Sequence, residues 1–353
     1  MKVTIDNPIF NLDDNISPIN YVYAGRISNL FIYLIFCFLA IRMIPFMKHT
    51  LLLLCLMPMN FTLASSLSYD AIILGVFFLF TAIIFKMIYD DDVKKLNKVF
   101  LYSMILLSAV MIQFKQVYFP MIFLFLLIPF SKFESKRQKN IWFVIILASG
   151  FISYVLWSAI LKICIRAGVT PPSSPSSEQV NFILSSPLEY VHILLSSIIN
   201  NMEFYFISFV GNLGWLDTNY PYLFIMFYFG MLIMSVVLDC SEKKNVISYK
   251  HKIFFAAISI FIVVLIESAL YIMWTSETSG VGYSYITGVQ GRYFIPLSLC
   301  MLIIFKTNIW KEKLEKFGAH KFVDFITPRV AVFSLVLTVI ILLLRYWIPV
   351  IQA

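Results

Sequence analysis

Long apolar stretches, interrupted by short polar segments, run through most of the chain. They lie at about residues 29–45, 50–68, 71–89, 99–112, 117–130, 141–163, 221–238, 253–274, 293–308 and 328–348. A helix of about 20 apolar residues crosses a ~30 Å hydrocarbon layer, so the pattern predicts an all-α, polytopic transmembrane bundle of about ten spans. The runs 99–112 and 117–130 are short for a span, and they predict a tight hairpin with Lys115 in its turn.

Pro58 and Asn60 interrupt the second apolar stretch. A proline inside a membrane helix removes a backbone hydrogen bond, and the freed carbonyl groups need other partners in a medium without water. We therefore expect a kinked helix at this point.

The segment between residues 164 and 220 differs from the rest. Its Pro- and Ser-rich part at 170–177 predicts a linker. In 187–210, apolar residues recur at helical spacing among polar ones, which favours an interfacial amphipathic helix over a further span. The predicted organisation is a polar outer segment at 1–28, a first half-bundle at 29–163, an outer loop with the interfacial helix at 164–220, and a second half-bundle at 221–353.

Composition indicates a membrane protein. With 60% hydrophobic and 13% charged residues and a mean hydropathy of +0.87, the chain has too few polar residues to cover a soluble globule. Its net charge of +8 comes from basic residues between the apolar runs, so we expect membrane lipids and no nucleic acid as partners. Neither the five cysteines nor the four histidines show metal or redox spacing. No metal site is predicted, and the sequence identifies no cofactor.

The lysines predict the orientation of the bundle. If 187–210 does not cross, the loops around Lys48, Lys94, Lys132, Lys243 and Lys311 all fall on one side, which the positive-inside rule makes cytoplasmic. The prediction is a multi-pass protein of the cytoplasmic membrane with both termini outside. Residues 1–28 lack the pattern of a signal peptide, so we also expect a span upstream of residue 1.

In that orientation, several uncommon polar residues gather at the outer ends of the spans. Asp70 begins the third stretch, and Arg292 lies in the turn between Gly288 and Pro296. The planar fork of an arginine suits phosphate or carboxylate, and the two glycines of this turn permit backbone conformations closed to other residues. Each residue alone is also typical of a structural role, Asp70 of a helix cap and Arg292 of an interfacial anchor. Glu267 adds an intramembrane carboxylate, which is costly to bury and therefore a functional candidate.

Four motifs occur in the order Leu56–Asp70, Lys115–Tyr118, Gly211–Asp217 and Gly288–Pro296. Together they resemble the bacterial membrane-protein family catalogued as domain of unknown function 2142, from Gly25 onward. That family is distantly similar to the C-type glycosyltransferases, polytopic enzymes that take sugar from a polyprenyl-phosphate carrier at the outer membrane face. The resemblance implies a bacterial inner-membrane protein of cell-envelope polysaccharide or glycolipid assembly. Those enzymes usually carry a catalytic carboxylate in the first outer loop, which here would precede residue 1.

Such a transferase needs a carboxylate to activate the acceptor and cations to stabilise the phosphate leaving group. We assign Asp70 as the candidate base, and Lys115 and Arg292 as phosphate ligands. The predicted substrate site is completed by Tyr118, Trp215, Asp217, Gln290 and Tyr293, with Trp215 and Tyr293 stacking on a sugar or packing along a prenyl chain. Two alternatives stay open. A flippase or exporter of a lipid-linked saccharide needs the cations without the base, and a non-catalytic membrane scaffold needs neither.

Overall fold

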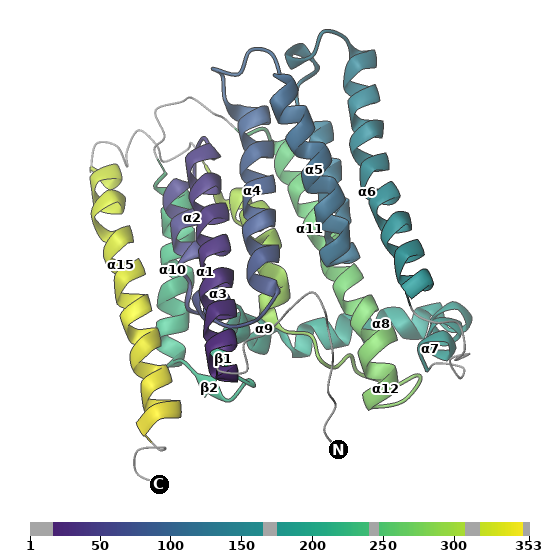
Figure 1. Cartoon of the computed structure of the whole chain (residues 1–353), viewed down its shortest axis with the longest axis vertical. Helices are drawn as coiled ribbons and strands as arrows, with labels where there is room; N and C mark the ends of the chain where they lie inside the picture. Colours follow the sequence, from purple (N-terminus) through teal and green to yellow (C-terminus); the bar gives the residue numbers. More distant parts are fainter. Residues whose placement is uncertain (1–16, 165–174, 240–246, 308–317, 349–353) are drawn as a thin grey trace.

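A computed structural model describes residues 17–164, 175–239, 247–307 and 318–348, and these are almost entirely helical (Figure 1). The first half contains α1 (Pro18–Met43), α2 (Lys48–Cys55), α3 (Pro58–Ala64), α4 (Asp70–Tyr89), α5 (Lys98–Phe114), the 3-10 helices η1 (Gln116–Leu127) and η2 (Phe130–Lys132), and α6 (Lys136–Cys164). The all-α fold predicted from the apolar pattern is confirmed.

The second half contains more short elements. They are α7 (Pro175–Ser185), α8 (Pro187–Asn200), α9 (Met202–Val210), β1 (Asn212–Leu213), β2 (Thr218–Asn219), α10 (Tyr222–Val237), α11 (Tyr249–Leu270), the π-helical turn η3 (Tyr271–Thr275), α12 (Ser276–Thr278), η4 (Gly291–Leu297), α13 (Ser298–Leu302), η5 (Ile303–Phe305), α15 (Ala319–Leu342) and the π-helical turn η6 (Leu343–Trp347). The two strands pair antiparallel, with Asn212 opposite Asn219.

Five of the described helical stretches are long and apolar enough to cross a membrane, and a sixth is obtained if α7 and α8 are counted together. The five are Pro18–Met43, Asp70–Tyr89, Lys136–Lys162, Tyr249–Thr278 and Lys321–Trp347. The expected number of about ten spans is not confirmed. The other predicted runs do form helices, but α5, η1, α10 and the η4–η5 stretch have only 10–17 residues, and the α2–α3 run is broken. Apolar composition therefore located the helices but not their lengths.

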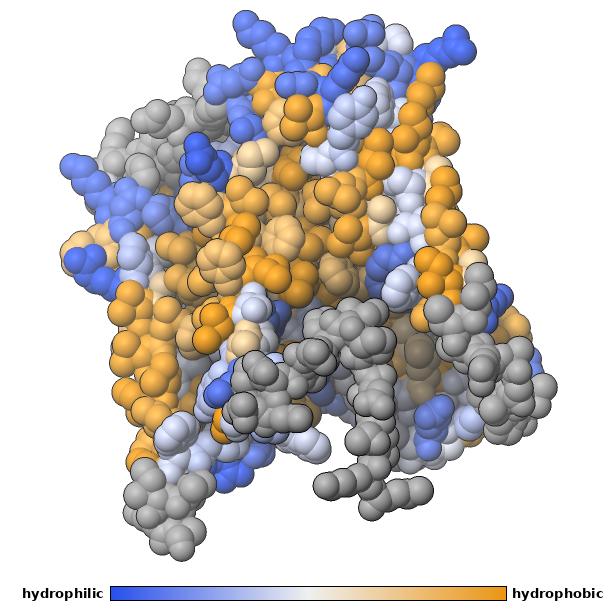
Figure 2. Space-filling model, in the orientation of Figure 1, coloured by the Kyte–Doolittle hydropathy of each residue, from blue (hydrophilic) through white to orange (hydrophobic). Residues whose placement is uncertain are grey.

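Polar residues separate toward two ends of the bundle. The segments that carry Lys94, Lys132 and Lys250 lie where α4 ends and where α5, α6 and α11 begin, at the top of Figure 1. Figure 2 shows this end as largely hydrophilic above a broad apolar band. We call it the basic end. The opposite end, called the pocket end, carries the start of α4, the turn between α5 and η1, the strand pair, and α7 to α9.

The break between α2 and α3 is closed by side chains, as the proline at position 58 led us to expect. The Asn60 amide donates to the carbonyl of Leu54 at 2.7 Å. The hydroxyl of Tyr33 on α1 donates to the carbonyl of Cys55, and that of Tyr228 on α10 to the carbonyl of Leu53, both at 2.8 Å. The carbonyls freed by Pro58 are thus paired without water, at the cost of depending on three different helices.

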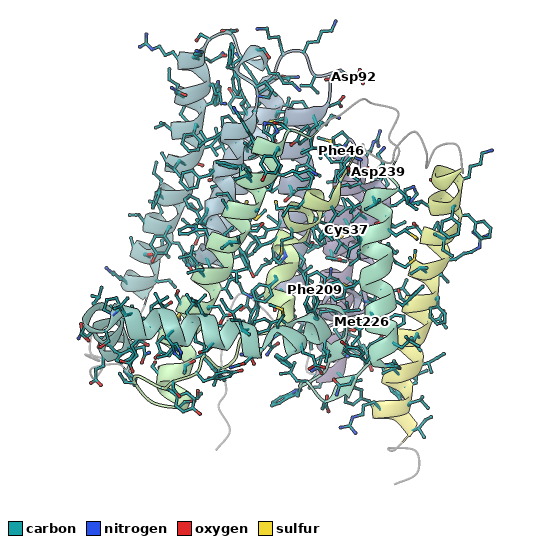
Figure 3. The ribbon with its side chains drawn as sticks, turned by 180° about the vertical axis from the view of Figure 1, so that it is seen from behind. Cys37, Phe46, Asp92, Phe209, Met226 and Asp239 are labelled. Carbon is teal, nitrogen blue, oxygen red and sulfur yellow. The ribbon has the colours of Figure 1, made fainter. Side chains whose placement is uncertain are left out.

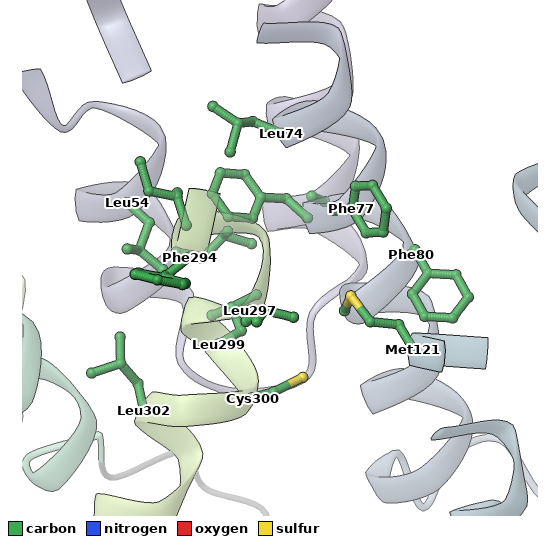
Figure 4. Close-up of a cluster of buried hydrophobic side chains, with 14 of the residues drawn as sticks. Leu54, Leu74, Phe77, Phe80, Met121, Phe294, Leu297, Leu299, Cys300 and Leu302 are labelled. Atoms are coloured by element: carbon green, nitrogen blue, oxygen red, sulfur yellow. The ribbon is translucent and has the colours of Figure 1, made fainter. Parts of the chain in front are cut away.

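Helix α4 is the centre of the packing. In its most apolar window 83% of residues are buried, against 11% for α6 and 22% for α1, which lie at the outside. Figure 4 shows Leu74, Phe77 and Phe80 of α4 in one buried cluster with Met121 of η1 and Leu297 of η4. The short helices η1 and η4 therefore sit against the central helix, which fixes the residues at their beginnings.

Helix α8 lies across the other helices at the pocket end (Figures 1 and 3). The chain bends by 107° between α7 and α8. One face of α8 buries Ile193, Leu194 and Ser197, while Leu188 and Ile199 are exposed on another. The interfacial position expected for 187–210 stays a prediction, because α7 and α8 together are also apolar enough for one broken span or a re-entrant loop.

Candidate functional site

Five of the predicted site residues meet at the pocket end. They are Asp70, Lys115, Tyr118, Arg292 and Tyr293, which line one small pocket together with Leu63, Ile73, Leu74 and Pro296. We call it the Lys115 pocket. The residues come from three regions far apart in sequence: the start of α4, the α5–η1 turn with the first turn of η1, and the first turn of η4.

Lys115 contacts several of the other residues of this pocket. It stands between α5 and η1, where the chain is extended and its side chain turns inward with 22% of its surface exposed. Its ammonium group lies 2.8 Å from a carboxylate oxygen of Asp70 and 4.7 Å from the ring centre of Tyr293. Tyr69 faces the same ammonium at 5.6 Å. A carboxylate and two aromatic faces therefore hold one cation at the bundle's end.

Asp70 does not cap α4 with its side chain, although its position at the helix start is typical of a cap. The residue before it, Tyr69, occupies the cap position without a side-chain hydrogen bond, and the Asp70 amide donates to the Ser68 hydroxyl. The carboxylate is thus left for Lys115. The neighbouring turn is tied down by Asn29 of α1, whose amide donates to the carbonyls of Ser66 and Ser68.

Arg292 is incompletely paired. Its Nε is buried and has no hydrogen-bond partner in the described part of the chain. The guanidinium carbon lies 5.4 Å from the ring centre of Tyr293, on which it stacks. The Tyr118 hydroxyl donates to the Tyr293 carbonyl at 2.8 Å and so joins η1 to η4 directly beside the arginine. A buried donor without a partner costs about 1–3 kcal/mol, which is a reason to look for a ligand here.

The two glycines before Arg292 have different roles. Gly288 has a φ of +83°, the left-handed conformation that the sequence reading anticipated for this turn. Gly291 is required by close approach instead. A Cβ at this position would lie 2.5 Å from the backbone nitrogen of Phe209 and still closer to the carbonyl oxygen of Tyr205. The Gly291 amide also donates to the Ser208 hydroxyl at 2.7 Å, so η4 rests directly on the backbone of α9.

The pocket is nearly filled by its own side chains. Its free volume is ≈ 10 Å³, about the space that one water molecule needs. Two cations and one carboxylate give a formal charge of +1. A ligand can enter only by displacing a side chain, and an anion would compete with Asp70 for Lys115 and Arg292.

Three other predicted residues lie elsewhere. Gln290 does not line the pocket, and its backbone carbonyl accepts from the Tyr293 amide at the start of η4. Asp217 lies in the loop between β1 and β2, where Arg345 of η6 contacts it at 3.0 Å. Trp215, in the same loop, is 95% exposed. The strand pair carries these two residues away from the Lys115 pocket.

The pKa of the Asp217 carboxyl lies below its usual range. The first cause is the hydrogen bond from Arg345, and hydrogen bonds from Tyr346 and Thr218 act in the same direction. This contact joins the strand pair to the last turn of the C-terminal helix. It gives Asp217 a structural partner of its own.

A second cavity was missed by the sequence reading. A groove of ≈ 430 Å³ is lined by Ile198, Met202, Tyr205, Phe206, Phe209, Phe229, Leu232, Ile233, Val263, Phe294, Ser298, Met301, Leu302 and Phe305. We call it the apolar groove. Figure 3 shows its framework, α10 and α11 on either side of the η4–η5 stretch, above α8 and α9. The helical spacing of residues 294, 298, 301, 302 and 305 is the signal in the sequence that could have revealed one wall.

Glu267 lies one helical turn beyond Val263, on the same face of α11. It is fully buried, and the Tyr205 hydroxyl donates to its Oε1 at 2.8 Å. Its Oε2 has no partner among the described residues. Glu267 does not line the Lys115 pocket, and it is linked to the groove through Tyr205, whose ring centre lies 5.2 Å from that of Phe294.

Within the described residues, no three His, Cys, Asp or Glu side chains gather as a metal site would require. A family model described as "Predicted membrane protein (DUF2142)" matches residues 15–301. No curated protein and no solved structure matches the chain.

Proposed function

The chain belongs to the DUF2142 family of predicted membrane proteins, and we propose that its Lys115 pocket binds the phosphate head group of a polyprenyl-phosphate sugar. The proposed role is that of a glycosyltransferase in cell-envelope polysaccharide or glycolipid assembly. One observation carries the proposal: the buried, unpaired Nε of Arg292 lies beside Lys115 in a pocket of net charge +1. A phosphate group supplies the acceptors that this arrangement lacks.

Binding and base release would be coupled. Because the pocket is nearly full, the phosphate takes the place of the Asp70 carboxylate as the partner of Lys115. Asp70 is then freed as a carboxylate at the edge of the site, where it can accept a proton from an acceptor hydroxyl. Lys115 and Arg292 stabilise the charge that develops on the departing phosphate.

The proposed orientation puts the pocket end outside the cytoplasmic membrane. It is supported by the lysines at the basic end, which the positive-inside rule assigns to the cytoplasm. A membrane-impermeant thiol reagent applied to intact cells should label Ser185→Cys of α7 and not Lys94→Cys. Both sites are tested in a background whose native cysteines are replaced. Labelling of Lys94→Cys alone would invert the orientation.

Arg292→Ala and Arg292→Lys test the binding step. Both lose the planar fork, so each should weaken the binding of a polyprenyl phosphate to the purified protein by roughly tenfold or more, at about 1.5–3 kcal/mol per charge-assisted contact. Arg345→Ala is the matched control, because it removes an arginine from the same end but outside the pocket. Unchanged affinity in both Arg292 variants would reduce Arg292 to an interfacial anchor.

A carrier without chemistry is the second candidate, favoured by the fact that Asp70 is already paired and is the one carboxylate among the residues that line the pocket. Liposomes that contain the protein, a polyprenyl-phosphate sugar and a lipid acceptor separate the two functions. A transferase changes the sugar's attachment, and Asp70→Asn should abolish that transfer while binding persists. Movement of the lipid-linked sugar across the bilayer without transfer would identify a flippase.

A further inference from the structure

The apolar groove follows the η4–η5 stretch along the bundle axis. From Phe294 to Phe305 the lining residues cover 11 positions, and a rise of about 1.5–2 Å per residue makes this roughly 16–22 Å long. Half of a ~30 Å hydrocarbon layer is ~15 Å. The groove is therefore about as deep as the acyl chains of one leaflet.

One lysine stands at the end of the groove nearest to Phe305. The ammonium group of Lys252 donates to the carbonyl of Ile304 at 2.9 Å and to that of Lys306. Lys252 precedes the lining residue Val263 by 11 positions, which on an α-helix returns to the same face within about 20°. Lys252 and the groove thus share one face of α11.

Of the two lysines that the structure describes at this end of the groove, only Lys252 is free to bind an anion. The Lys306 ammonium is 6% exposed and lies 3.0 Å from a carboxylate oxygen of Asp239, so this charge is neutralised inside the protein. The Asp239 carboxylate also accepts from the Met47 amide at the start of α2. Lys252 forms no ion pair within the described residues and has a third N–H donor. Its positive charge is therefore not neutralised by the described residues, and this charge lies beside the apolar groove.

We propose that the apolar groove binds one acyl chain of an anionic phospholipid whose head group lies at the basic end, on Lys252. The charge selects an anionic head group, and the depth of the groove selects a chain that reaches from the basic end toward the bilayer midplane. The head-group position at the basic end is separate from the Lys115 pocket, although the far end of the groove, at Phe294, adjoins Tyr293 of that pocket. The proposal does not depend on the function proposed for the pocket. A neutral phospholipid would fill the groove but would leave Lys252 without an anion.

Native mass spectrometry of the detergent-solubilised full chain, titrated with phosphatidylglycerol or phosphatidylcholine of the same acyl chains, tests the proposal. We expect phosphatidylglycerol to be retained preferentially. Lys252→Met should lower that preference by about fivefold, the effect of one lysine near a membrane surface. Lys250→Met is the control, because Lys250 is exposed on the same helix but does not contact the η5 carbonyls.

A second pair of variants tests the chain's position. Met301→Trp fills the groove and should reduce retention of both phospholipids, whereas Phe31→Trp changes an exposed aromatic residue of α1 and should not. Phosphatidylglycerol with a diazirine in its acyl chain should crosslink to the η4–η5 stretch in the wild type and not in Met301→Trp. The melting curve of the Met301→Trp variant shows whether this substitution unfolds the protein. If it does, Phe305→Trp, at the open edge of the groove, is used in its place.

Equal retention of the two phospholipids, or equal losses in Lys252→Met and Lys250→Met, would overturn the proposal. So would retention of a polyprenyl phosphate in preference to phosphatidylglycerol that is lost in Arg292→Ala, because the groove would then belong to the ligand of the Lys115 pocket. Loss of polyprenyl-phosphate binding alone would leave the phospholipid site intact. The two proposals can therefore fail separately.

Discussion

Replacement of Gly291 by alanine should be among the most damaging single-methyl changes in this protein. The new Cβ would meet the backbone of α9, at 2.5 Å from the Phe209 nitrogen and 2.9 Å from the Ser208 carbonyl carbon. Backbone atoms inside a helix cannot rotate away as a flexible side chain can. The η4 helix must therefore move off α9, and Arg292 moves with it.

The expected cost can be built from two contributions. Overpacking a tight contact costs about 1–3 kcal/mol, and weakening the hydrogen bond from the Gly291 amide to Ser208 costs about 1 kcal/mol more. The sum is about 2–4 kcal/mol. Gly230→Ala provides the matched control, because a Cβ there meets nothing within 4 Å and sits inside α10. There alanine gains up to about 1 kcal/mol of helix propensity.

Thermal melting of the purified variants in one detergent measures the difference, with the fraction of monodisperse protein after heating as the readout. We expect Gly291→Ala to melt several degrees below the wild type and Gly230→Ala at or above it. The binding of a polyprenyl phosphate should fall in Gly291→Ala alone, since Arg292 is displaced. Equal melting of the two variants would refute the close-approach argument and leave conformational freedom as the role of Gly291.

Three further outcomes follow from the same contacts. Asn60→Leu removes the shorter of two hydrogen bonds to the Leu54 carbonyl, the other coming from the Met57 amide at 3.3 Å, and should lower stability by about 1 kcal/mol in the same melting assay, so a wild-type curve would contradict a stabilising role for the Asn60 amide. Asp239→Asn leaves Lys306 buried without its counter-ion and should cost about 3 kcal/mol, more than the double variant with Lys306→Met, and a larger loss in the double variant would contradict this. The pKa of Asp217 is lowered by Arg345, so the docking of the strand pair on η6 should persist from neutral pH to below the usual carboxyl range near 4, and should be lost as the pH falls through the lowered pKa. Limited proteolysis of the loop against pH measures this docking, and cleavage that already rises between pH 7 and 5 would speak against it.

The sequence predicted the helices, and five of the eight residues that it suggested for a site line one pocket. The positions of the loop lysines oriented the predicted spans so that Asp70, Lys115 and Arg292 fall at one end of the bundle. In the structure these three residues line one pocket. The alternation of spans and loops along the chain assigns each residue to one end of the bundle. The neighbours of that residue at this end depend on how the helices pack, which the alternation does not determine.

Trp215 and Asp217 show that limit. Both belong to the pocket end, yet they lie in the loop of a strand pair of two residues each, where Asp217 contacts Arg345 of the C-terminal helix and Trp215 is exposed. Strands of two residues are too short to produce a recognisable periodicity in the sequence. The contact with Arg345 joins positions 128 residues apart, and this pairing depends on how α10 and α15 pack.

The lengths of the helices also could not be predicted from the sequence. Apolar composition continues through Pro120 of η1 and Pro296 of η4, whereas both segments form short 3-10 helices. A proline lacks the backbone donor that a regular α-helix uses, so the chain tightens or ends there. The apolar groove is likewise invisible locally, since its lining comes from α8, α9, α10, α11 and the η4–η5 stretch together.

The closed break at Pro58 also bears on how the protein is made. The Leu53 carbonyl accepts a hydrogen bond from the hydroxyl of Tyr228, which follows it by 175 residues and is therefore synthesised later. At a synthesis rate of about 5–20 residues per second, that partner leaves the ribosome roughly 10–35 seconds later. During this interval α2 and α3 lack one of the contacts that close their joint in the finished fold. The first half-bundle should therefore remain an adjustable assembly in the membrane until α10 is inserted, and a chain truncated before α10 should be a preferred target of membrane proteases.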